Sequence, residues 1–164
     1  MSYTPLLERV DIFDELNKER LERISNICVE HRYNQGDLIF QESTRSDGLY
    51  IILNGDVDIQ VDPHSSSGAD QEASGPVTIA KLRRGQSFGE VALVDEGMRS
   101  ASARSASADT RLLLIRRVDL LELCRDDFEL GFILMRNLAA DLALKIRQTD
   151  LMMRQRLMWG AREA

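Results

Sequence analysis

Apolar residues recur at helical spacing near residues 5 to 30, and charged residues fill the positions between them. This period places the apolar side chains on one face of a helix. We therefore expect helices in this segment, the second of them containing Glu19 to Val29. Asp14 and Asn17 precede that second helix, and either side chain is suited to cap its first turn.

From Tyr33 the pattern changes to short apolar runs separated by turn residues, which is typical of strands. The strands expected from these runs are residues 38–40, 48–53, 57–61, 77–82 and 111–115. Asn54-Gly55 lies between two of them and predicts a hairpin, because a type I′ turn needs positive φ at both positions. The small residues of Arg99 to Ala108 predict another strand. Residues 62–76, which include His64, are polar and rich in Gly, Ser and Pro, and they predict a mobile hairpin loop.

Helical spacing returns from Arg117. We expect a short helix over Val118 to Cys124 and a long one from Phe128 to about Met158, with Gly131 as a candidate interruption. Asp126-Asp127 is suited to cap the long helix. The apolar stripe expected to lie over the strands consists of Phe132, Met135, Leu138, Leu142 and Ile146. The far end of this helix is basic, with Arg147, Arg154, Arg156 and Arg162.

The chain has 164 residues, 43% of them hydrophobic and 29% charged, with a formal net charge of −6. This length suffices for one domain with a substantial core. The negative charge disfavours duplex nucleic acid as a partner, since duplex binding relies on Lys and Arg. No apolar run is long enough to span a bilayer, and the N-terminus lacks a signal-peptide pattern, so we expect a cytoplasmic location. The isolated Cys28 and Cys124 imply neither a disulfide framework nor a zinc site.

One stretch, Ser87 to Leu93, combines residues suited to bind an anion. Gly89 lets the backbone approach a ligand closely, because it has no Cβ. The residues after it favour a helical turn whose first N–H groups are free. Arg99 adds a planar fork of donors that suits a phosphate, and Ser100 adds a hydroxyl. Glu90 alone would repel phosphate, but its carboxylate suits a sugar hydroxyl, so the combination indicates a nucleotide.

The order Phe88-Gly89-Glu90-x-Ala92-Leu93, followed by Arg99-Ser100-Ala101, closely resembles the phosphate-binding cassette of the cyclic nucleotide-binding domain family. In that family the Gly and the Glu meet the ribose side and the Arg meets the cyclic phosphate, which implies these roles for Gly89, Glu90 and Arg99. The Glu-to-Arg spacing resembles that of the kinase regulatory subunits rather than the bacterial catabolite activator. The ligand-binding residues implied within the cassette, residues 87–101, are Phe88, Gly89, Glu90, Val91, Ala92, Leu93, Arg99, Ser100 and Ala101.

The resemblance implies an α+β fold. It predicts an antiparallel β-roll, also called a jelly roll or double-stranded β-helix, with N-terminal helices and a long C-terminal helix. The expected parts are an N-terminal helical element at residues 1–35, the β-roll at 36–116, and C-terminal lid and dimerisation helices at 117–164. Together they form one cyclic nucleotide-binding domain. The residues outside the cassette that also fit the family are Gly36-Asp37, Asp47, Tyr50, Ile52 and Gly55, whereas Glu42 stands where the family commonly has Gly.

The implied function is a regulatory or sensor module and not an enzyme. Its ligand is a cyclic nucleotide, with cyclic AMP favoured over cyclic GMP because Ser100 matches the commoner cyclic AMP choice in the family. Arg104 is a rival phosphate ligand, and Leu142 and Ile146 are candidates to cover the base. The long helix is expected to pair two copies of the chain and to relay binding to an unidentified effector. We expect no metal or other cofactor, and no direct DNA binding, because nothing follows Ala164 to form a winged helix-turn-helix.

Three alternatives stay open. A β-roll with a degenerate cassette would serve only as an interaction or dimerisation module, although Glu90 and Arg99 are both present. The chain is otherwise a domain of a larger channel, transporter or transcription regulator. A metal-dependent jelly-roll enzyme of the cupin type needs clustered ligands, and the two histidines, His31 and His64, are far apart in the sequence.

Overall fold

A computed structural model of the protein describes residues 2–62, 75–94 and 97–160. The expected loop around His64 and the basic Arg162 lie mostly or wholly outside these residues. The helices and strands, in chain order, are α1 (Thr4–Leu7), η1 (Asp11–Phe13), α2 (Lys18–Asn26), β1 (Cys28–Tyr33), β2 (Leu38–Phe40), β3 (Gly48–Asn54), β4 (Asp56–Val61), β5 (Val77–Arg83), β6 (Ser87–Phe88), α3 (Val91–Val94), β7 (Ser102–Ser105), β8 (Thr110–Arg116), α4 (Arg117–Asp126) and α5 (Phe128–Gly160).

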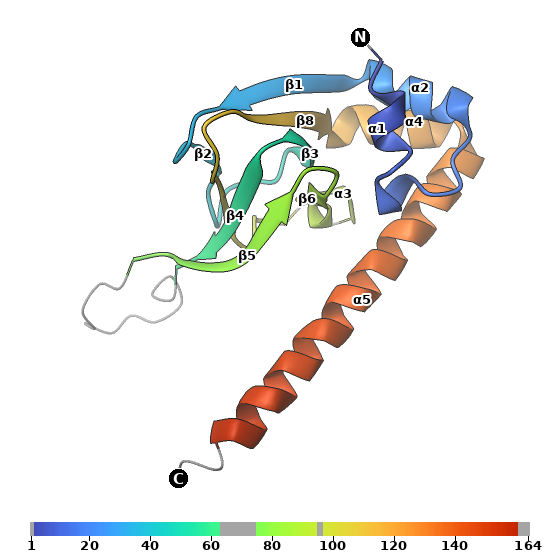
Figure 1. Ribbon diagram of the computed structural model, residues 1–164. Coiled ribbons are helices and arrows are strands. Elements are labelled where there is room, and N and C mark those ends of the chain that lie inside the picture. Colours follow the sequence, from blue (N-terminus) through green and yellow to red (C-terminus); the bar gives the residue numbers. More distant parts are fainter. Residues whose placement is uncertain (1, 63–74, 95–96, 161–164) are drawn as a thin grey trace.

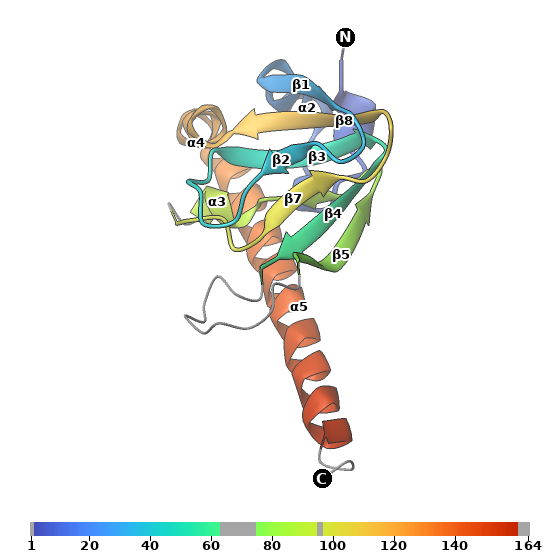
Figure 2. The ribbon, with the colours of Figure 1, turned by 90° about the vertical axis from the view of Figure 1, so that its left-hand side faces the viewer.

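The described strands form two four-stranded sheets, ordered β1-β8-β3-β6 and β2-β7-β4-β5, and every pairing is antiparallel. The sheets lie face to face, the N-terminal helices pack at one end, and α5 extends well beyond the rest of the domain (Figures 1 and 2). The expected β-roll with N-terminal helices and a long C-terminal helix is confirmed. Its division at residues 35 and 116 stays a prediction.

The buried side chains of β3 show how one strand serves two cores. Successive residues of a strand point to opposite faces, and Leu49 to Ile52 are all buried. Leu49 and Ile51 pack with the helices, whereas Tyr50 and Ile52 pack between the two sheets. The continuous apolar run therefore reports burial on both faces, as expected for a central strand.

The helix expected to contain Glu19 to Val29 is shorter than its pattern indicates, and this expectation was wrong at its C-terminal end. The helix α2 ends at Asn26, and Val29 lies in β1, where it pairs with Leu114 of β8. Backbone hydrogen bonds to β8 along all of β1 outweigh the helical spacing. Of the two candidate caps, Asn17 is the one observed: its side chain accepts a hydrogen bond from the Arg20 amide at 2.9 Å.

Asn54-Gly55 does not close a hairpin, because β3 and β4 belong to different sheets. Of these two turn residues, only Gly55 has a positive φ, at +83°. The Asn54 side chain donates a hydrogen bond to the Asp109 carbonyl at 2.7 Å, and a Cβ on Gly55 would lie 2.7 Å from the Thr110 hydroxyl. The turn therefore fits against the β7–β8 connection as a corner between sheets, which the local motif alone does not specify.

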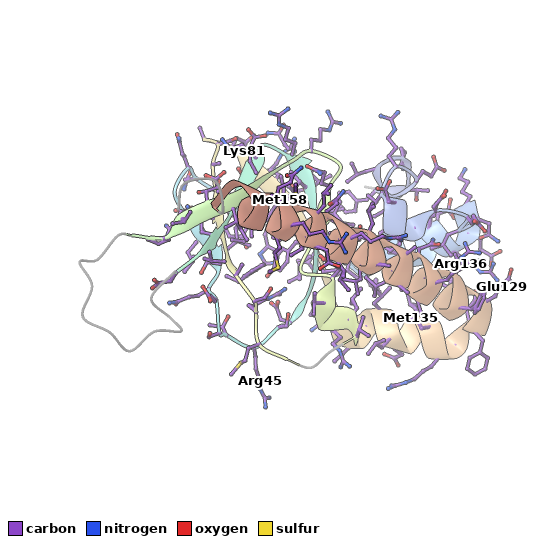
Figure 3. All side chains as sticks on the ribbon, turned by 90° about the horizontal axis from the view of Figure 1, so that it is seen from below. Arg45, Lys81, Glu129, Met135, Arg136 and Met158 are labelled. Carbon is purple, nitrogen blue, oxygen red and sulfur yellow. The ribbon has the colours of Figure 1, made fainter. Side chains whose placement is uncertain are left out.

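The helix α5 is continuous through Gly131, so the candidate interruption is absent. Its buried face contains Leu130, Leu134 and Leu138. The expected stripe was therefore wrong in part, since Phe132 is 67% exposed and Ile146 is 62% exposed, while the following three residues of α5 do contact the core: Met135, Leu138 and Leu142. Figure 3 looks at α5 from below, with Glu129, Met135 and Arg136 near its first turns and Met158 near its end.

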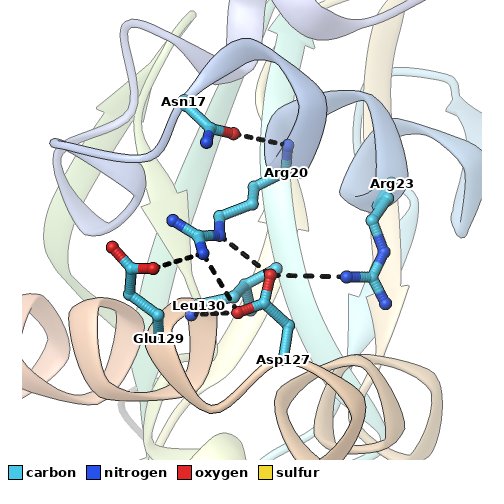
Figure 4. Close-up of polar contacts among 6 residues, drawn as sticks. All are labelled: Asn17, Arg20, Arg23, Asp127, Glu129 and Leu130. Carbon is cyan, nitrogen blue, oxygen red and sulfur yellow. Dashed lines mark hydrogen bonds and ion pairs between the residues drawn. The ribbon is translucent and has the colours of Figure 1, made fainter.

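Charged side chains fasten α2 to the junction of α4 and α5 (Figure 4). The Arg20 guanidinium donates hydrogen bonds to Asp127 at 2.8 Å and to Glu129 at 2.6 Å, and Arg23 lies 3.4 Å from Asp127. Asp127 Oδ1 also accepts from the Leu130 amide at 3.0 Å, which caps α5 as expected. We call Arg20, Arg23, Asp127 and Glu129 the junction clamp.

Asp127→Asn tests the charge of the junction clamp, because asparagine can still cap a helix. The hydrogen bond from Arg20, and then the one from Leu130, hold the pKa of Asp127 below its ordinary value. A depressed carboxyl pKa stabilises the fold above the unfolded value of about 3.9, and this contribution is lost as pH falls through the folded value. We expect Asp127→Asn to lower the free energy of unfolding at pH 7 and the difference to shrink below roughly pH 4. Urea unfolding across this pH range measures it.

The matched control is Asp126→Asn, because Asp126 is the exposed neighbour of Asp127. We expect that control to unfold like the unsubstituted chain at every pH. A loss for Asp127→Asn that is equally large at pH 7 and at pH 2.5 would show that the charge of Asp127 does not matter.

Candidate functional site

A cavity of about 1070 Å³ lies where the cassette, the second sheet, the N-terminal segment and α5 meet. Residues from all four regions line it, which brings together segments at both ends of the chain. The lining includes Tyr3, Leu6, Arg9, Phe40, Ile59, Leu82, Gly89, Glu90, Arg99, Ser100, Asp141 and Lys145. A cavity of this size and mixed lining is typical of small-molecule sites.

Arg99 supplies a buried positive charge in the wall of this cavity, with only 5% of its surface exposed. One guanidinium nitrogen donates to Asp47 at 2.5 Å and to the Gly48 carbonyl at 3.1 Å. The other terminal nitrogen lies 3.5 Å from the Gly89 carbonyl oxygen. The Nε atom is buried without a hydrogen-bond partner among the residues that the structure describes. The site therefore holds a paired cation whose Nε donor is unused by the described residues.

Aromatic rings pack against one face of this guanidinium. The Arg99 Cζ lies 4.0 Å from the centre of the Phe40 ring, a distance at which a cation and a ring face attract each other. Phe40, Tyr50 and Phe88 pack together, with ring centres 5.3 to 5.8 Å apart. Burial, followed by the nearby Asp47, raises the pKa of the Tyr50 hydroxyl, so this ring stays neutral at physiological pH. The rings and Asp47 thus fix the guanidinium plane.

Gly89 is required by the backbone at the cavity wall. Its φ is +76°, a region that L residues with side chains rarely adopt. A Cβ there would lie 2.4 Å from an Arg99 guanidinium nitrogen and 3.1 Å from the Gly48 carbonyl oxygen. The glycine therefore lets the backbone of the cassette come close to the guanidinium, while the close approach to a ligand expected from the sequence stays a prediction.

Glu90 comes next and is 7% exposed. It precedes the single helical turn α3, and its carbonyl accepts a hydrogen bond from the Leu93 amide at 3.0 Å. Its carboxylate lies 2.6 Å from Lys145 Nζ of α5. Lys145 also contacts Asp141, one turn earlier in α5, at 2.8 Å. The acid and the guanidinium of the cassette thus line one cavity, but they have different partners.

The structure brings most of the predicted site residues to the cavity. The predicted ligand-binding residues that line it are Phe88, Gly89, Glu90, Val91, Arg99, Ser100 and Ala101. Leu93 instead packs in the core, and the side chain of Ala92 is outside the described part of the structure. Leu142 packs against the core and Ile146 is exposed, and neither lines the cavity. Their role as cover for a base stays a prediction.

Sequence reasoning missed the residues that α5 and the N-terminal segment bring to the cavity. Asp141 and Lys145 are spaced i, i+4, which in a sequence indicates an ordinary surface ion pair. Tyr3 and Arg9 precede the first strand and carry no motif. The rival Arg104 lies elsewhere and donates to the Gly36 carbonyl at 2.5 Å. The aromatic support from Phe40 was also missed, because a short apolar strand does not reveal its contacts.

The described residues offer little support for a metal site, a reactive thiol or a membrane-spanning helix. They contain no group of three or more His, Cys, Asp and Glu side chains placed to hold a metal ion. Burial raises the pKa of the Cys28 thiol to about 12, so at neutral pH it is not a thiolate nucleophile. Among the described helices none is long and apolar enough to cross a membrane.

Comparison with known proteins agrees with this geometry. The family model described as "Cyclic nucleotide-binding domain" matches residues 30–127, which contain most of β1, all the other strands, the cassette and α4. The chain is 35% identical over 140 residues to the cyclic AMP receptor protein of Thermus thermophilus, covering 85% of this chain and 59% of that protein. It is 32% identical over 107 residues to a Drosophila melanogaster cGMP-dependent protein kinase, covering 65% of this chain and 11% of the kinase.

A solved structure shares the fold over most of the chain. The crystal structure of the Thermus thermophilus catabolite activator protein matches with a TM-score of 0.72 and 31% identity, covering 88% of this chain and 62% of that one. The chain therefore spans only part of the length of these relatives.

Gly89→Ala tests the close approach of the cassette backbone to Arg99, and Gly36→Ala is its matched control. Both glycines have positive φ, but a Cβ on Gly36 would meet nothing within 4 Å. The left-handed backbone alone costs about 1–2 kcal/mol with a side chain. We expect Gly36→Ala to lower the free energy of unfolding by that amount and Gly89→Ala to lower it further. Urea unfolding of both variants measures the difference. Equal losses of unfolding free energy would mean that the Arg99 side chain moves aside at no cost.

Proposed function

The chain belongs to the cyclic nucleotide-binding domain family, and from this premise we propose that its cavity binds a cyclic purine mononucleotide and that binding regulates a partner. In this proposal Arg99 holds the cyclic phosphate and Glu90 accepts a hydrogen bond from the sugar hydroxyl. The cassette residues Phe88, Gly89, Val91, Ala92, Leu93, Ser100 and Ala101 complete the binding site. The chain acts as a regulatory domain and not as a catalyst.

The observation that carries this proposal is the buried guanidinium of Arg99. Its pairing with Asp47 and two carbonyls fixes its position, and its Nε remains a buried donor without a partner among the described residues. A buried donor without a partner is costly. Arg99 lines the cavity, and because its Nε has almost no exposed surface, in this proposal a small shift of the guanidinium brings that donor to the bound anion. A phosphate suits the planar fork of a guanidinium.

Glu90 narrows the proposal from any phosphate to a nucleotide. A carboxylate in the same cavity repels a free anion, so inorganic phosphate gains less there than a ligand that also offers a hydroxyl. The free hydroxyl of a 3′,5′-cyclic ribonucleotide is the 2′ one, beside the phosphate ring. Arg99 and Glu90 line the same cavity, as one ligand with both groups requires.

The preference for cyclic AMP over cyclic GMP rests on Ser100. Ser100 lines the cavity, and the resemblance to the family implies that serine at this place is the commoner choice in cyclic AMP readers. The relatives named above include a cyclic AMP receptor and a cGMP-dependent kinase, so the ligand is a matter for titration with both nucleotides.

The output of the proposed sensor is α5. The described apolar residues exposed on its second half are Leu144, Ile146, Leu151, Met152, Met153 and Met158. An apolar surface of this kind on a protruding helix is suited to another helix. We propose that two copies of the chain pair through it and that the basic end of α5 contacts an effector. A cytoplasmic location is part of this proposal.

Arg99→Ala tests the phosphate role, because a hydrogen bond to a charged group contributes about 1.5–3 kcal/mol. We expect the Kd for cyclic AMP to rise roughly ten- to a hundredfold. Arg99→Lys keeps the charge but loses the fork and should also weaken binding. Calorimetric titration with cyclic AMP and cyclic GMP measures both.

The control for this series is Arg104→Ala, which removes an arginine that does not line the cavity. We expect its Kd to match that of the unsubstituted chain, with circular dichroism confirming that each variant is folded. An unchanged Kd in folded Arg99→Ala would refute the role of Arg99. Binding of neither nucleotide by the unsubstituted chain would favour a β-roll that serves only as an interaction module.

Met153→Glu tests pairing through α5, because a charge on a buried helix contact opposes association. We expect the unsubstituted chain to sediment as a dimer at tens of micromolar and Met153→Glu to sediment as a monomer. Gln155→Glu adds the same charge to the opposite face of the helix, beside Leu151 and Met158, so the two variants together show which apolar face of α5 forms the dimer. A monomeric unsubstituted chain at that concentration would contradict the pairing.

A further inference from the structure

Lys145 of α5 already contacts one oxygen of the carboxylate that the proposed ligand would use. Its Nζ lies 2.6 Å from Glu90 Oε1, within the range of a strong charge-assisted hydrogen bond. Glu90 is 7% exposed, so water has little access to its carboxylate. The side chain of Lys145 is 45% exposed. Lys145 therefore compensates a nearly buried acid from the rim of the cavity.

Lys145 lies at the point along α5 where the helix leaves the rest of the domain. Among the residues that the structure describes, the Lys145–Glu90 ion pair joins α5 to the cassette. Beyond it, every described side chain of α5 from residue 146 onward is exposed. The ion pair thus marks the place where α5 leaves the domain, and it couples that place to the cavity.

Asp141 makes it possible for Lys145 to release Glu90. The same ammonium lies 2.8 Å from Asp141 Oδ2, four residues earlier on the same helix. Burial disfavours the charged ammonium, but the hydrogen bonds to Asp141 and Glu90 outweigh it and raise the pKa of Lys145. If Glu90 takes another partner, Lys145 keeps Asp141 and stays charged.

We propose that Lys145 is a specificity-determining residue that competes with the sugar hydroxyl of the ligand for Glu90. The proposal rests on the function proposed above, in which Glu90 accepts that hydroxyl. In this proposal the 2′-hydroxyl binds at Oε1, the oxygen of Glu90 that Lys145 contacts, so it gains its hydrogen bond only by displacing the ion pair. A ligand without the hydroxyl leaves the ion pair intact. Lys145 thereby reduces the discrimination between ribose and 2′-deoxyribose, and binding of the ribonucleotide detaches α5 from the cassette.

Lys145→Met tests the competition with two ligands, cyclic AMP and 2′-deoxy cyclic AMP. Methionine keeps an unbranched apolar side chain and favours the helix, but it leaves Glu90 free. The lost ammonium charge acts on the phosphate of both ligands alike, so we expect the Kd for cyclic AMP to fall about two- to fivefold relative to the Kd for the deoxy ligand, the size of a half-exposed ion pair. The ratio of the Kd for the deoxy ligand to the Kd for cyclic AMP therefore rises by the same factor. Calorimetric titration at low salt measures all four.

Two further variants make the result specific. Arg147→Met removes a charge from an exposed position of α5 and should leave the ratio of Kd values unchanged. Glu90→Gln removes the shared acceptor charge, and adding Lys145→Met to it should no longer change the ratio. Amide hydrogen exchange in the ligand-free protein should be faster around residues 141–149 in Lys145→Met than in Arg147→Met.

The outcomes separate the two proposals. If both ligands bind and Lys145→Met leaves their ratio unchanged, the competition is wrong and the nucleotide site stands. If Lys145→Met weakens cyclic AMP binding and lowers the ratio, Lys145 holds the ligand instead, and the competition is again wrong. If no variant binds either nucleotide, the proposed function itself fails.

Discussion

The structure depends on keeping one guanidinium out of water without leaving its charge unpaired. An isolated buried charge is strongly unfavourable. Arg99 is held by Asp47, by the carbonyls of Gly48 and Gly89, and by the face of Phe40. Two of these residues are glycines for a steric reason, since a Cβ would meet a β8 carbonyl oxygen at 2.3 Å or the guanidinium at 2.4 Å. The pairing of one charge therefore fixes the start of β3 and the cassette turn together.

The N-terminal segment and α5 meet beside Arg99, and they hold each other. The junction clamp ties α2 to the start of α5 (Figure 4), and Asn137 of α5 donates to the carbonyl of Asp14 at 2.7 Å. The N-terminal segment and α5 each line the cavity. Since each element positions the other, a change in the angle of α5 also alters the wall formed by the N-terminal segment.

The sequence predicted the parts that depend on local chemistry. Gly89, Glu90 and Arg99 were singled out because their chemistry suits a phosphate and a sugar hydroxyl and their order resembles the family's cassette, and all three line the cavity. The expected strands after Tyr33 were recognised from short apolar runs between turn residues. The corner at Asn54-Gly55 was wrong because a two-residue motif specifies a turn and not the sheet that the chain enters next. Lys145 was missed for a related reason: its i, i+4 partner satisfies the surface pattern, and only the fold brings Glu90 to it.

The two attachments of α5 differ in strength, and this difference limits how the proposed relay can work. Asp127 and Lys145 are about 27 Å apart along the helix. The junction clamp holds the first with several charges, and one ion pair holds the second. Between the two, Leu130, Leu134 and Leu138 are buried, so loss of the weaker contact frees only the part of the helix that lies beyond them. A ligand shifts the equilibrium between two positions of α5 only by the ratio of its affinities for them. A contact that changes this ratio only a few-fold therefore gives a graded response. A complete switch needs about 10⁴-fold, which requires further contacts, such as those of a second chain along the exposed half of α5.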